Sequence, residues 1–156
     1  HIAGLETFVL HTPGHTIGHV IYYIPDIPLV FSGDTLFAFG CGRIFEGTSK
    51  QMWNSLKKFF LFDPKTLVFC GHNYTEQNLK FALSVEENNH FLTKKYAAIK
   101  NNNFNNTPTV PSKLSDEFLG NPFLRCNNKD FIEKFGNNNI SPEEIFAKLR
   151  KMKDEY

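Results

Sequence analysis

The chain has 156 residues, enough for one compact domain or for a small domain joined to part of another. Its formal net charge of +1 gives no electrostatic reason to expect nucleic acid or a membrane surface as a partner, and no apolar run approaches the length of a bilayer-spanning helix. The three widely spaced cysteines do not suggest a secreted disulfide framework, which favours a reducing compartment such as the cytoplasm.

The first half of the sequence alternates short apolar runs with one helical stretch. Because the sequence starts at His1 and runs directly into a strand pattern, we expect the native protein to begin earlier, so a targeting peptide would not be visible. Runs of β-branched and aromatic residues bounded by Gly, Pro or Asp predict strands at 6–12, 19–25, 29–34 and 66–72. An apolar face predicts a helix within 48–62. Strands on both sides of a helix favour a layered α/β fold.

The second half has the pattern of a helical region. Apolar residues at helical spacing predict helices at 75–87, 89–100, 129–135 and 141–153. The last has a clear start signal, in which Ser141 caps the helix, Pro142 takes the first position and Glu144 completes a capping box. No strand pattern of comparable quality follows Phe69, and the Asn-rich stretches 101–106 and 137–139 are interpreted as loops. We therefore predict an α/β unit over 1–73 and a helical unit over 74–156.

Three candidate metal ligands follow predicted strands. His15 lies in "HTPGHTIGH" after the first strand, Asp34 ends the third strand and His72 ends the fourth. Loops at strand ends converge in an open α/β sheet, so these side chains can meet. Imidazole and carboxylate suit zinc, iron or manganese, and a carboxylate can bridge two ions. Each residue also has an ordinary alternative, since a single histidine is often structural and an Asp after a strand often belongs to a turn.

The same motifs resemble those of a known superfamily. "HTPGHTIGH", "FSGDTLF" and "CGH" resemble the later metal-binding motifs of the metallo-β-lactamase superfamily. More narrowly, "GDTLFAFGCGRIFEGT", "CGHNYT", "TVPSKLSDEF", "NPFLR" and "LRKMKDEY" resemble the hydroxyacylglutathione hydrolases (glyoxalase II enzymes), in order along the whole chain. The resemblance implies part of an αββα sandwich followed by a small helical glutathione-binding domain. It also implies hydrolysis of the thioester S-D-lactoylglutathione to D-lactate and glutathione by a metal-bound hydroxide.

The resemblance assigns roles to the histidines and to Asp34. His15, which follows Pro-Gly, and His72 match metal ligands, and Asp34 matches the carboxylate that bridges two divalent ions, which are zinc, iron or manganese. His11 matches no ligand, and His19 is interpreted as supporting the ligands or the fold. The family's first metal motif, Thr-His-x-His-x-Asp-His, does not occur in this sequence. We therefore expect the C-terminal part of the enzyme, with a partial or empty metal site and no activity by itself.

Cations and hydroxyls are expected to hold glutathione, which carries a carboxylate at each end. By resemblance Arg43 in "GCGR", Tyr74, and Arg150 with Lys153 on the last helix contact the substrate. Arg150 and Lys153 are three residues apart and share one helix face, where an arginine can hold a carboxylate bidentately. Without the resemblance, a solvated helix end explains this pair as well. Phe45 replaces a tyrosine of the family pattern, which predicts greater reliance on Arg43.

Two other interpretations stay open from the sequence. A persulfide dioxygenase of the same superfamily, with a single iron and glutathione persulfide as substrate, shares the His, Asp and "GCGR" elements. A non-catalytic fragment is the second, because the chain supplies three candidate ligands and half of the sandwich. Such a fragment is expected to bury its exposed sheet by self-association, whereas the intact enzyme is expected to be a monomer. Cys41 is interpreted as a small buried loop residue rather than a nucleophile.

Overall fold

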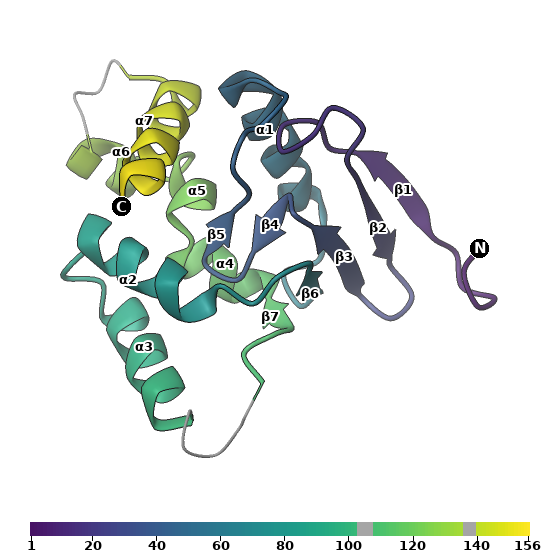
Figure 1. Ribbon diagram of the computed structural model, residues 1–156. Coiled ribbons are helices and arrows are strands. Elements are labelled where there is room, and N and C mark those ends of the chain that lie inside the picture. Colours follow the sequence, from purple (N-terminus) through teal and green to yellow (C-terminus); the bar gives the residue numbers. More distant parts are fainter. Residues whose placement is uncertain (103–107, 136–139) are drawn as a thin grey trace.

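The computed structural model describes residues 1–102, 108–135 and 140–156, which form an α/β fold (Figure 1). The first half contributes strands β1 (Phe8–His11), β2 (Val20–Ile24), β3 (Leu29–Gly33), β4 (Leu36–Phe37), β5 (Gly40–Cys41) and β6 (Leu67–Cys70). Helix α1 (Ser49–Leu56) and the 3₁₀ helix η1 (Lys57–Leu61) lie between β5 and β6. The strands and the helix predicted for this half are confirmed, and the short strands β4 and β5 are additional to them.

The order of the strands explains why the candidate ligands lie at one edge. Within the described residues the main sheet has five strands in the order β1-β2-β3-β6-β7, where β7 spans Ser112–Lys113. Strands β3 and β6 run parallel, and the other neighbours are antiparallel. The carboxyl ends of β3 and β6 therefore meet, and Asp34 and His72 follow there. Strands β4 and β5 form a separate hairpin that leads to Gly42 and Arg43.

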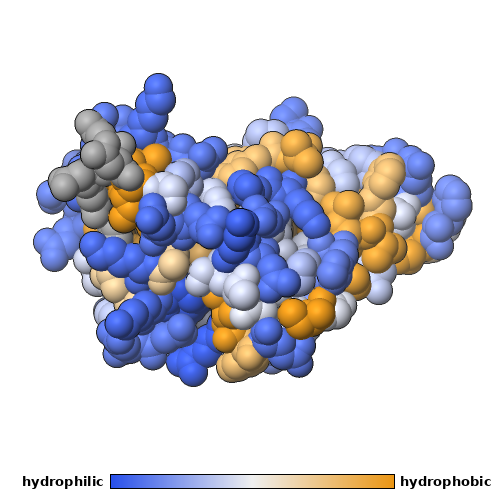
Figure 2. All heavy atoms as spheres, turned by 90° about the horizontal axis from the view of Figure 1, so that it is seen from above, coloured by the Kyte–Doolittle hydropathy of each residue, from blue (hydrophilic) through white to orange (hydrophobic). Residues whose placement is uncertain are grey.

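One face of the main sheet is covered by helices, and the other is left open by the residues that the structure describes. Ile21, Val30 and Val68 have no solvent exposure, whereas Tyr22 and Phe31, which are paired across β2 and β3, are 38% and 44% exposed. This alternation is the pattern of a sheet with one buried face. Figure 2 shows hydrophobic side chains on the surface at the end of the molecule that carries the N-terminal strands. Self-association through this open face stays a prediction.

The second half is mostly helical. It comprises α2 (Thr75–Val85), α3 (His90–Asn102), α4 (Leu114–Gly120), α5 (Pro122–Arg125), α6 (Lys129–Phe135) and α7 (Pro142–Glu155). The four predicted helices are confirmed as α2, α3, α6 and α7, and the capping box of Ser141 and Glu144 is present. None of the described helices combines the length and the apolar character needed to cross a bilayer.

Two expectations for the second half need correction. Strand β7 follows Phe69 in sequence and pairs with β6, but its two residues are too short to produce an alternating pattern. Positions 101 and 102 were expected in a loop and are the end of α3 instead. The remaining positions of that Asn-rich stretch, 103–106, and the stretch 137–139 lie outside the described residues.

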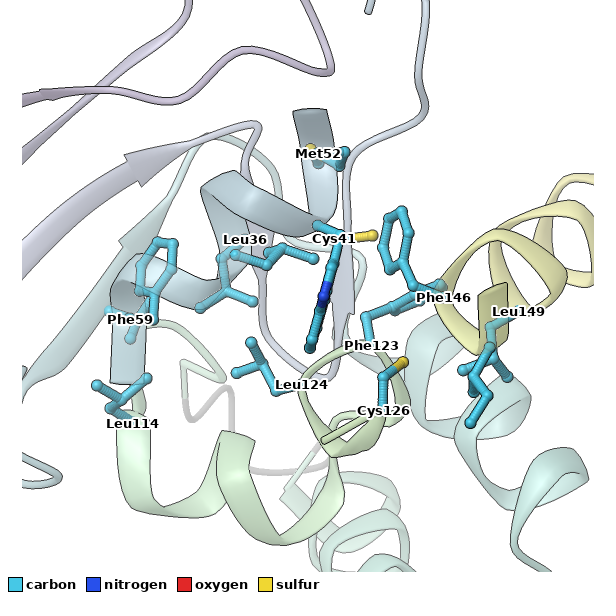
Figure 3. Close-up of a cluster of buried hydrophobic side chains, with 14 of the residues drawn as sticks. Leu36, Cys41, Met52, Phe59, Leu114, Phe123, Leu124, Cys126, Phe146 and Leu149 are labelled. Carbon is cyan, nitrogen blue, oxygen red and sulfur yellow. The ribbon is translucent and has the colours of Figure 1, made fainter. Parts of the chain in front are cut away.

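A hydrophobic core joins the two halves of the chain. Leu36 and Cys41 of the hairpin and Met52 of α1 belong to the same buried cluster as Phe123 of α5 and Phe146 of α7, as Figure 3 shows. Burial of aromatic side chains from both halves favours their association by several kcal/mol, at about 25 cal/mol per Å². The packing therefore does not separate the two parts, and the division at residue 73 stays a prediction.

Candidate metal and substrate site

The carboxylate of Asp34 lies between the imidazoles of His15 and His72. Asp34 follows Gly33, whose φ of +49° lies in the left-handed region that favours glycine. The Gly71 N–H donates to the Gly33 carbonyl over 2.9 Å, which keeps the ends of β3 and β6 together. Nε2 of His15 is 3.3 Å from Oδ2 of Asp34, and Nε2 of His72 is 3.7 Å from Oδ1. The structure thus brings the three candidate ligands together.

The donor set around Asp34 suits a divalent ion. Two imidazole nitrogens and a carboxylate are ligands that zinc, iron and manganese accept. Oδ1 of Asp34 is buried and has no hydrogen-bond partner among the described residues, and a cation would compensate it. In the described parts of the chain, however, no three His, Cys, Asp or Glu side chains are spaced to hold a metal ion. The residues fit part of a coordination shell rather than a complete one.

A hydrogen bond orients the ring of His15. Its Nδ1 lies 2.8 Å from the carbonyl oxygen of Arg43, and because a carbonyl only accepts, Nδ1 carries the proton. In the neutral ring Nε2 then has no hydrogen and faces Asp34, which is the form of imidazole that binds metals. Phe45 packs on the ring, with the ring centroids 4.9 Å apart. The loop after β5 therefore orients the first candidate ligand.

His19 contacts the backbone of Asp34. The N–H of Asp34 donates to Nε2 of His19 over 3.0 Å, so the proton of this ring is on Nδ1. Nδ1 lies 3.2 Å from the hydroxyl of Thr12 and 3.1 Å from that of Thr35. Burial lowers the pKa of His19, which favours the neutral ring that this arrangement needs. The position of the candidate bridging carboxylate thus depends on a histidine that points its acceptor nitrogen at the backbone.

A cavity of about 680 Å³ holds the three candidate ligands in its wall. This volume is typical of sites for small organic ligands. The predicted substrate contacts Arg43, Tyr74, Arg150 and Lys153 also line this cavity. The ring of Tyr74 stacks on that of His72, with centroids 5.3 Å apart and an interplanar angle of 20°. The cavity therefore combines a candidate metal site with side chains suited to an anionic ligand.

The cations of the cavity differ in how free they are to bind a ligand. Arg43 is exposed, and its Nε is 3.5 Å from Oδ1 of Asp154. Arg150 is buried, and its Nη1 and Nη2 donate to the carbonyl of Cys41 and to Asp154, each over 2.9 Å. Lys153 is half-buried, and burial followed by the charges of Arg150 and Arg43 lowers its pKa to about 8. Since both Nη groups of Arg150 hold protein acceptors, its bidentate grip on a substrate stays a prediction.

The two halves of the chain match two family models. Residues 1–72 match the metallo-beta-lactamase superfamily, and residues 73–156 match the model described as hydroxyacylglutathione hydrolase C-terminus. The chain belongs to the hydroxyacylglutathione hydrolase family. Curated hydroxyacylglutathione hydrolases from Rhodospirillum rubrum and Maricaulis maris are 44% and 43% identical over 155 and 148 residues, which is 99% and 95% of this chain. The chain spans 60% and 58% of the length of those relatives.

Solved structures agree with the fold of this hydroxyacylglutathione hydrolase family member. ETHE1 from Myxococcus xanthus is similar with a TM-score of 0.53 at 26% identity, over 98% of this chain and 55% of the other. The B3 metallo-beta-lactamase BLEG-1 gives a TM-score of 0.52 at 25% identity, over 80% of this chain and 44% of the other. The predicted fold class, part of a metallo-β-lactamase sandwich joined to helices, is confirmed.

Asp154 and Tyr156 contact the predicted cations of this hydroxyacylglutathione hydrolase family member and are additional to the predicted set. Asp154 pairs with both Arg43 and Arg150, and its spacing of four residues from Arg150 is a sequence signal for the second pair. Tyr156 lines the cavity, and the centroid of its ring lies 5.1 Å from Nζ of Lys153. No periodic pattern marks Tyr156, because it follows the end of α7.

Cys41 and His11 have the environments expected of them. Cys41 is 5% exposed, so its prediction as a buried residue is confirmed, but it lies in strand β5 and not in a loop, because it pairs with Leu36 of β4. Burial raises the pKa of its thiol to about 11, which leaves little nucleophilic thiolate at neutral pH. Nε2 of His11 lies 2.6 Å from the carbonyl of Ile17, so this ring is engaged with the backbone of the following loop.

Proposed function

We propose that the chain is the C-terminal part of a metal-dependent thioester hydrolase that converts S-D-lactoylglutathione into D-lactate and glutathione. The observation that carries the proposal is the convergence of His15, Asp34 and His72 in the wall of a cavity lined by cations. Membership of the hydroxyacylglutathione hydrolase family supports the substrate. Because the chain spans 60% of its Rhodospirillum rubrum relative, we attribute the activity to the whole protein and not to this chain alone.

The candidate ligands would share two divalent ions. Oδ2 of Asp34 faces His15 and Oδ1 faces His72, so this carboxylate would bridge an ion held by each imidazole. We propose zinc, with iron or manganese as metals that the same ligands accept. A bound divalent ion lowers the pKa of its coordinated water and polarises the thioester carbonyl. Asp34 and the two imidazoles would hold these ions in the wall of the cavity.

The remaining cavity residues would hold glutathione. Arg43 and Lys153, with Arg150, would bind its carboxylates, and the phenol of Tyr74 would contact its peptide backbone. The departing thiol has a pKa of about 8.5, so it leaves as thiolate without a dedicated acid. We place the protein in the cytoplasm, which is supported by the free thiols of Cys41, Cys70 and Cys126.

Metal content and hydrolysis, measured together, test the proposal. The chain is compared alone and fused to the N-terminal part of the Rhodospirillum rubrum relative. We expect the fused protein to bind two divalent ions and to hydrolyse S-D-lactoylglutathione, because the fusion supplies the missing first metal motif. We expect the chain alone to bind at most one ion and to be inactive. Oxygen uptake with glutathione persulfide in place of hydrolysis would contradict the proposal and favour the dioxygenase.

Replacing Arg43 by methionine should raise the KM for S-D-lactoylglutathione. Loss of a hydrogen bond to a charged group costs about 1.5 kcal/mol, which is roughly tenfold in affinity. Because Arg43 would contact the part of the substrate that does not react, kcat should change little. Lys50→Met, which removes an exposed cation from α1, is the control and should leave KM unchanged. Steady-state kinetics of the fused protein give both constants, and an unchanged KM for Arg43→Met rules out this contact.

The KM should also rise with pH as Lys153 loses its charge. The pKa of this side chain is lowered to about 8, so the ammonium that would hold a carboxylate is present below pH 8 and lost above it. In Lys153→Arg the guanidinium stays protonated, so KM should stay low at alkaline pH. KM measured from about pH 6.5 to about pH 9.5 compares the two proteins. Identical pH profiles would show that Lys153 does not bind the substrate.

A further inference from the structure

The turn between β4 and β5 is buried and conformationally strained. Its residues Ala38 and Phe39 are 2% and 4% exposed. Phe39 has a φ of +57°, in the left-handed region that a non-glycine residue adopts only where its surroundings enforce it. The strand pairs Leu36–Cys41 and Phe37–Gly40 leave the polar groups of the turn itself to other partners. Buried backbone groups require such partners, so something must hold this turn in place.

A carboxylate and an amide from the second half hold one side of the turn. The N–H of Phe39 donates to Oε2 of Glu117 over 2.8 Å, across 78 residues of sequence. Nδ2 of Asn121 donates to the same Oε2 over 2.9 Å and to the carbonyl of Gly40 over 3.0 Å. Glu117 and Asn121 are both fully buried. They therefore act as one unit on the strained residue and its neighbour.

Two other helices hold the same hairpin. Nδ2 of Asn78 on α2 donates to the carbonyl of Ala38 over 3.0 Å, and Nη1 of Arg150 on α7 donates to the carbonyl of Cys41 over 2.9 Å. Both of these residues are 5% exposed. We refer to the following four buried side chains as the turn clamp: Asn78, Glu117, Asn121 and Arg150. The turn clamp fixes the hairpin backbone from Ala38 to Cys41 with groups from the helical half.

The hairpin leads directly into the candidate metal site. Gly42 follows β5 and lies so close to Asp34 that a Cβ at position 42 would overlap the carbonyl oxygen of Asp34. The next residue, Arg43, provides the carbonyl that accepts the Nδ1–H of His15. A displacement of the hairpin would therefore move the backbone that supports Asp34 and the acceptor that orients His15.

We propose that Glu117 is a positioning residue for the metal site and that, through the turn clamp, it sets the orientation of the His15 imidazole. The inference rests on the proposed function to the extent that His15 is taken as a metal ligand. Burial raises the pKa of Glu117 to about 7, so the fold keeps a carboxyl group where burial opposes its ionisation. An apolar residue would suit this position if packing alone mattered, which supports a role in fixing the backbone of the turn.

The tautomer of the His15 ring tests the positioning role of Glu117 and can be measured without bound metal and without an activity assay. Nitrogen-15 NMR of the metal-free chain, recorded at alkaline pH where the imidazole is neutral, distinguishes a proton on Nδ1 from one on Nε2. We expect the Nδ1–H form in the parent chain and in Glu117→Gln, whose amide oxygen still accepts from Phe39. In Glu117→Leu the acceptor is lost, so we expect a mixture of both tautomers. The affinity of the chain for Zn²⁺ should fall about 10–100-fold in this variant, as for other groups that orient a ligand.

Ile145→Ala is the matched control, because Ile145 is a fully buried side chain of α7 whose truncation also lowers stability. It should leave the His15 tautomer and the Zn²⁺ affinity unchanged. If Glu117→Leu does not fold, Asn78→Ala removes one bond of the same clamp and should shift the tautomer to a smaller extent. If folded Glu117→Leu, or Asn78→Ala in its place, keeps the His15 tautomer of the parent chain, the inference is overturned. Absence of hydrolysis in the fused parent protein would overturn the proposed function and leave this readout intact.

Discussion

Replacing Asp34 by asparagine is expected to abolish metal binding and thioester hydrolysis. The amide keeps the size of the side chain but loses the negative charge and one acceptor oxygen. The two oxygens concerned face His15 at 3.3 Å and His72 at 3.7 Å. Metal stabilisation of transition-state charge contributes several kcal/mol, so the loss in kcat/KM should be about 1,000-fold or more. Metal analysis and a thioester assay of the fused protein measure both effects.

Asp26→Asn is the control for this substitution, because Asp26 is an exposed carboxylate in the turn between β2 and β3. It should keep parental metal content and turnover. The metal-free Asp34→Asn protein should be at least as stable as the parent, since it replaces a partly buried charge by a neutral group. Turnover within tenfold of the parent in Asp34→Asn would exclude Asp34 as a bridging ligand.

Gly42→Ala is expected to damage both the stability and the site. A Cβ at position 42 would overlap the carbonyl oxygen of Asp34 and lie 3.2 Å from Nδ1 of His15. Backbone must move to make room, and overpacking of this kind lowers the free energy of unfolding by about 1–3 kcal/mol. The same movement displaces two candidate ligands, and a displacement of about 1 Å costs about 100-fold in rate. Denaturant unfolding and the thioester assay measure the two effects.

Gly18→Ala provides the comparison, because a Cβ at position 18 meets no atom within 4 Å. This variant should keep the stability of the parent within about 0.5 kcal/mol and should keep its turnover. Equal stability and rate in Gly42→Ala and the parent would show that the loop after β5 is not tightly held against Asp34.

Helices and strands long enough to show a repeating pattern of apolar residues were predictable from the sequence. Helix α7 has an apolar face and a capping box at Ser141, and β2 and β3 have β-branched and aromatic runs bounded by turn residues. Strands β4, β5 and β7 contain two residues each, and α5 contains four, so no periodicity could develop. Their existence depends on pairing and packing partners that are distant in sequence.

The candidate site was predictable in its residues but not in its geometry. His15, Asp34 and His72 are recognisable because chemically suitable side chains follow three strands, and strand ends converge. The buried state of Arg150 was not predictable, since a basic residue near a helix end also suits solvent. The burial of Glu117 was not predictable either, because a glutamate in the first turn of a short helix gives no sign that it will be buried.

The sequence by itself determined the family, the principal strands and helices, and the three side chains proposed to bind metal, because motifs and periodicity are properties of neighbouring residues. Only the tertiary structure decided which nitrogen of His15 faces Asp34 and how the helical half holds the β4–β5 turn. These features depend on hydrogen bonds between residues that are far apart in the chain. Such bonds depend on the hydrophobic core, which holds the two halves of the chain together.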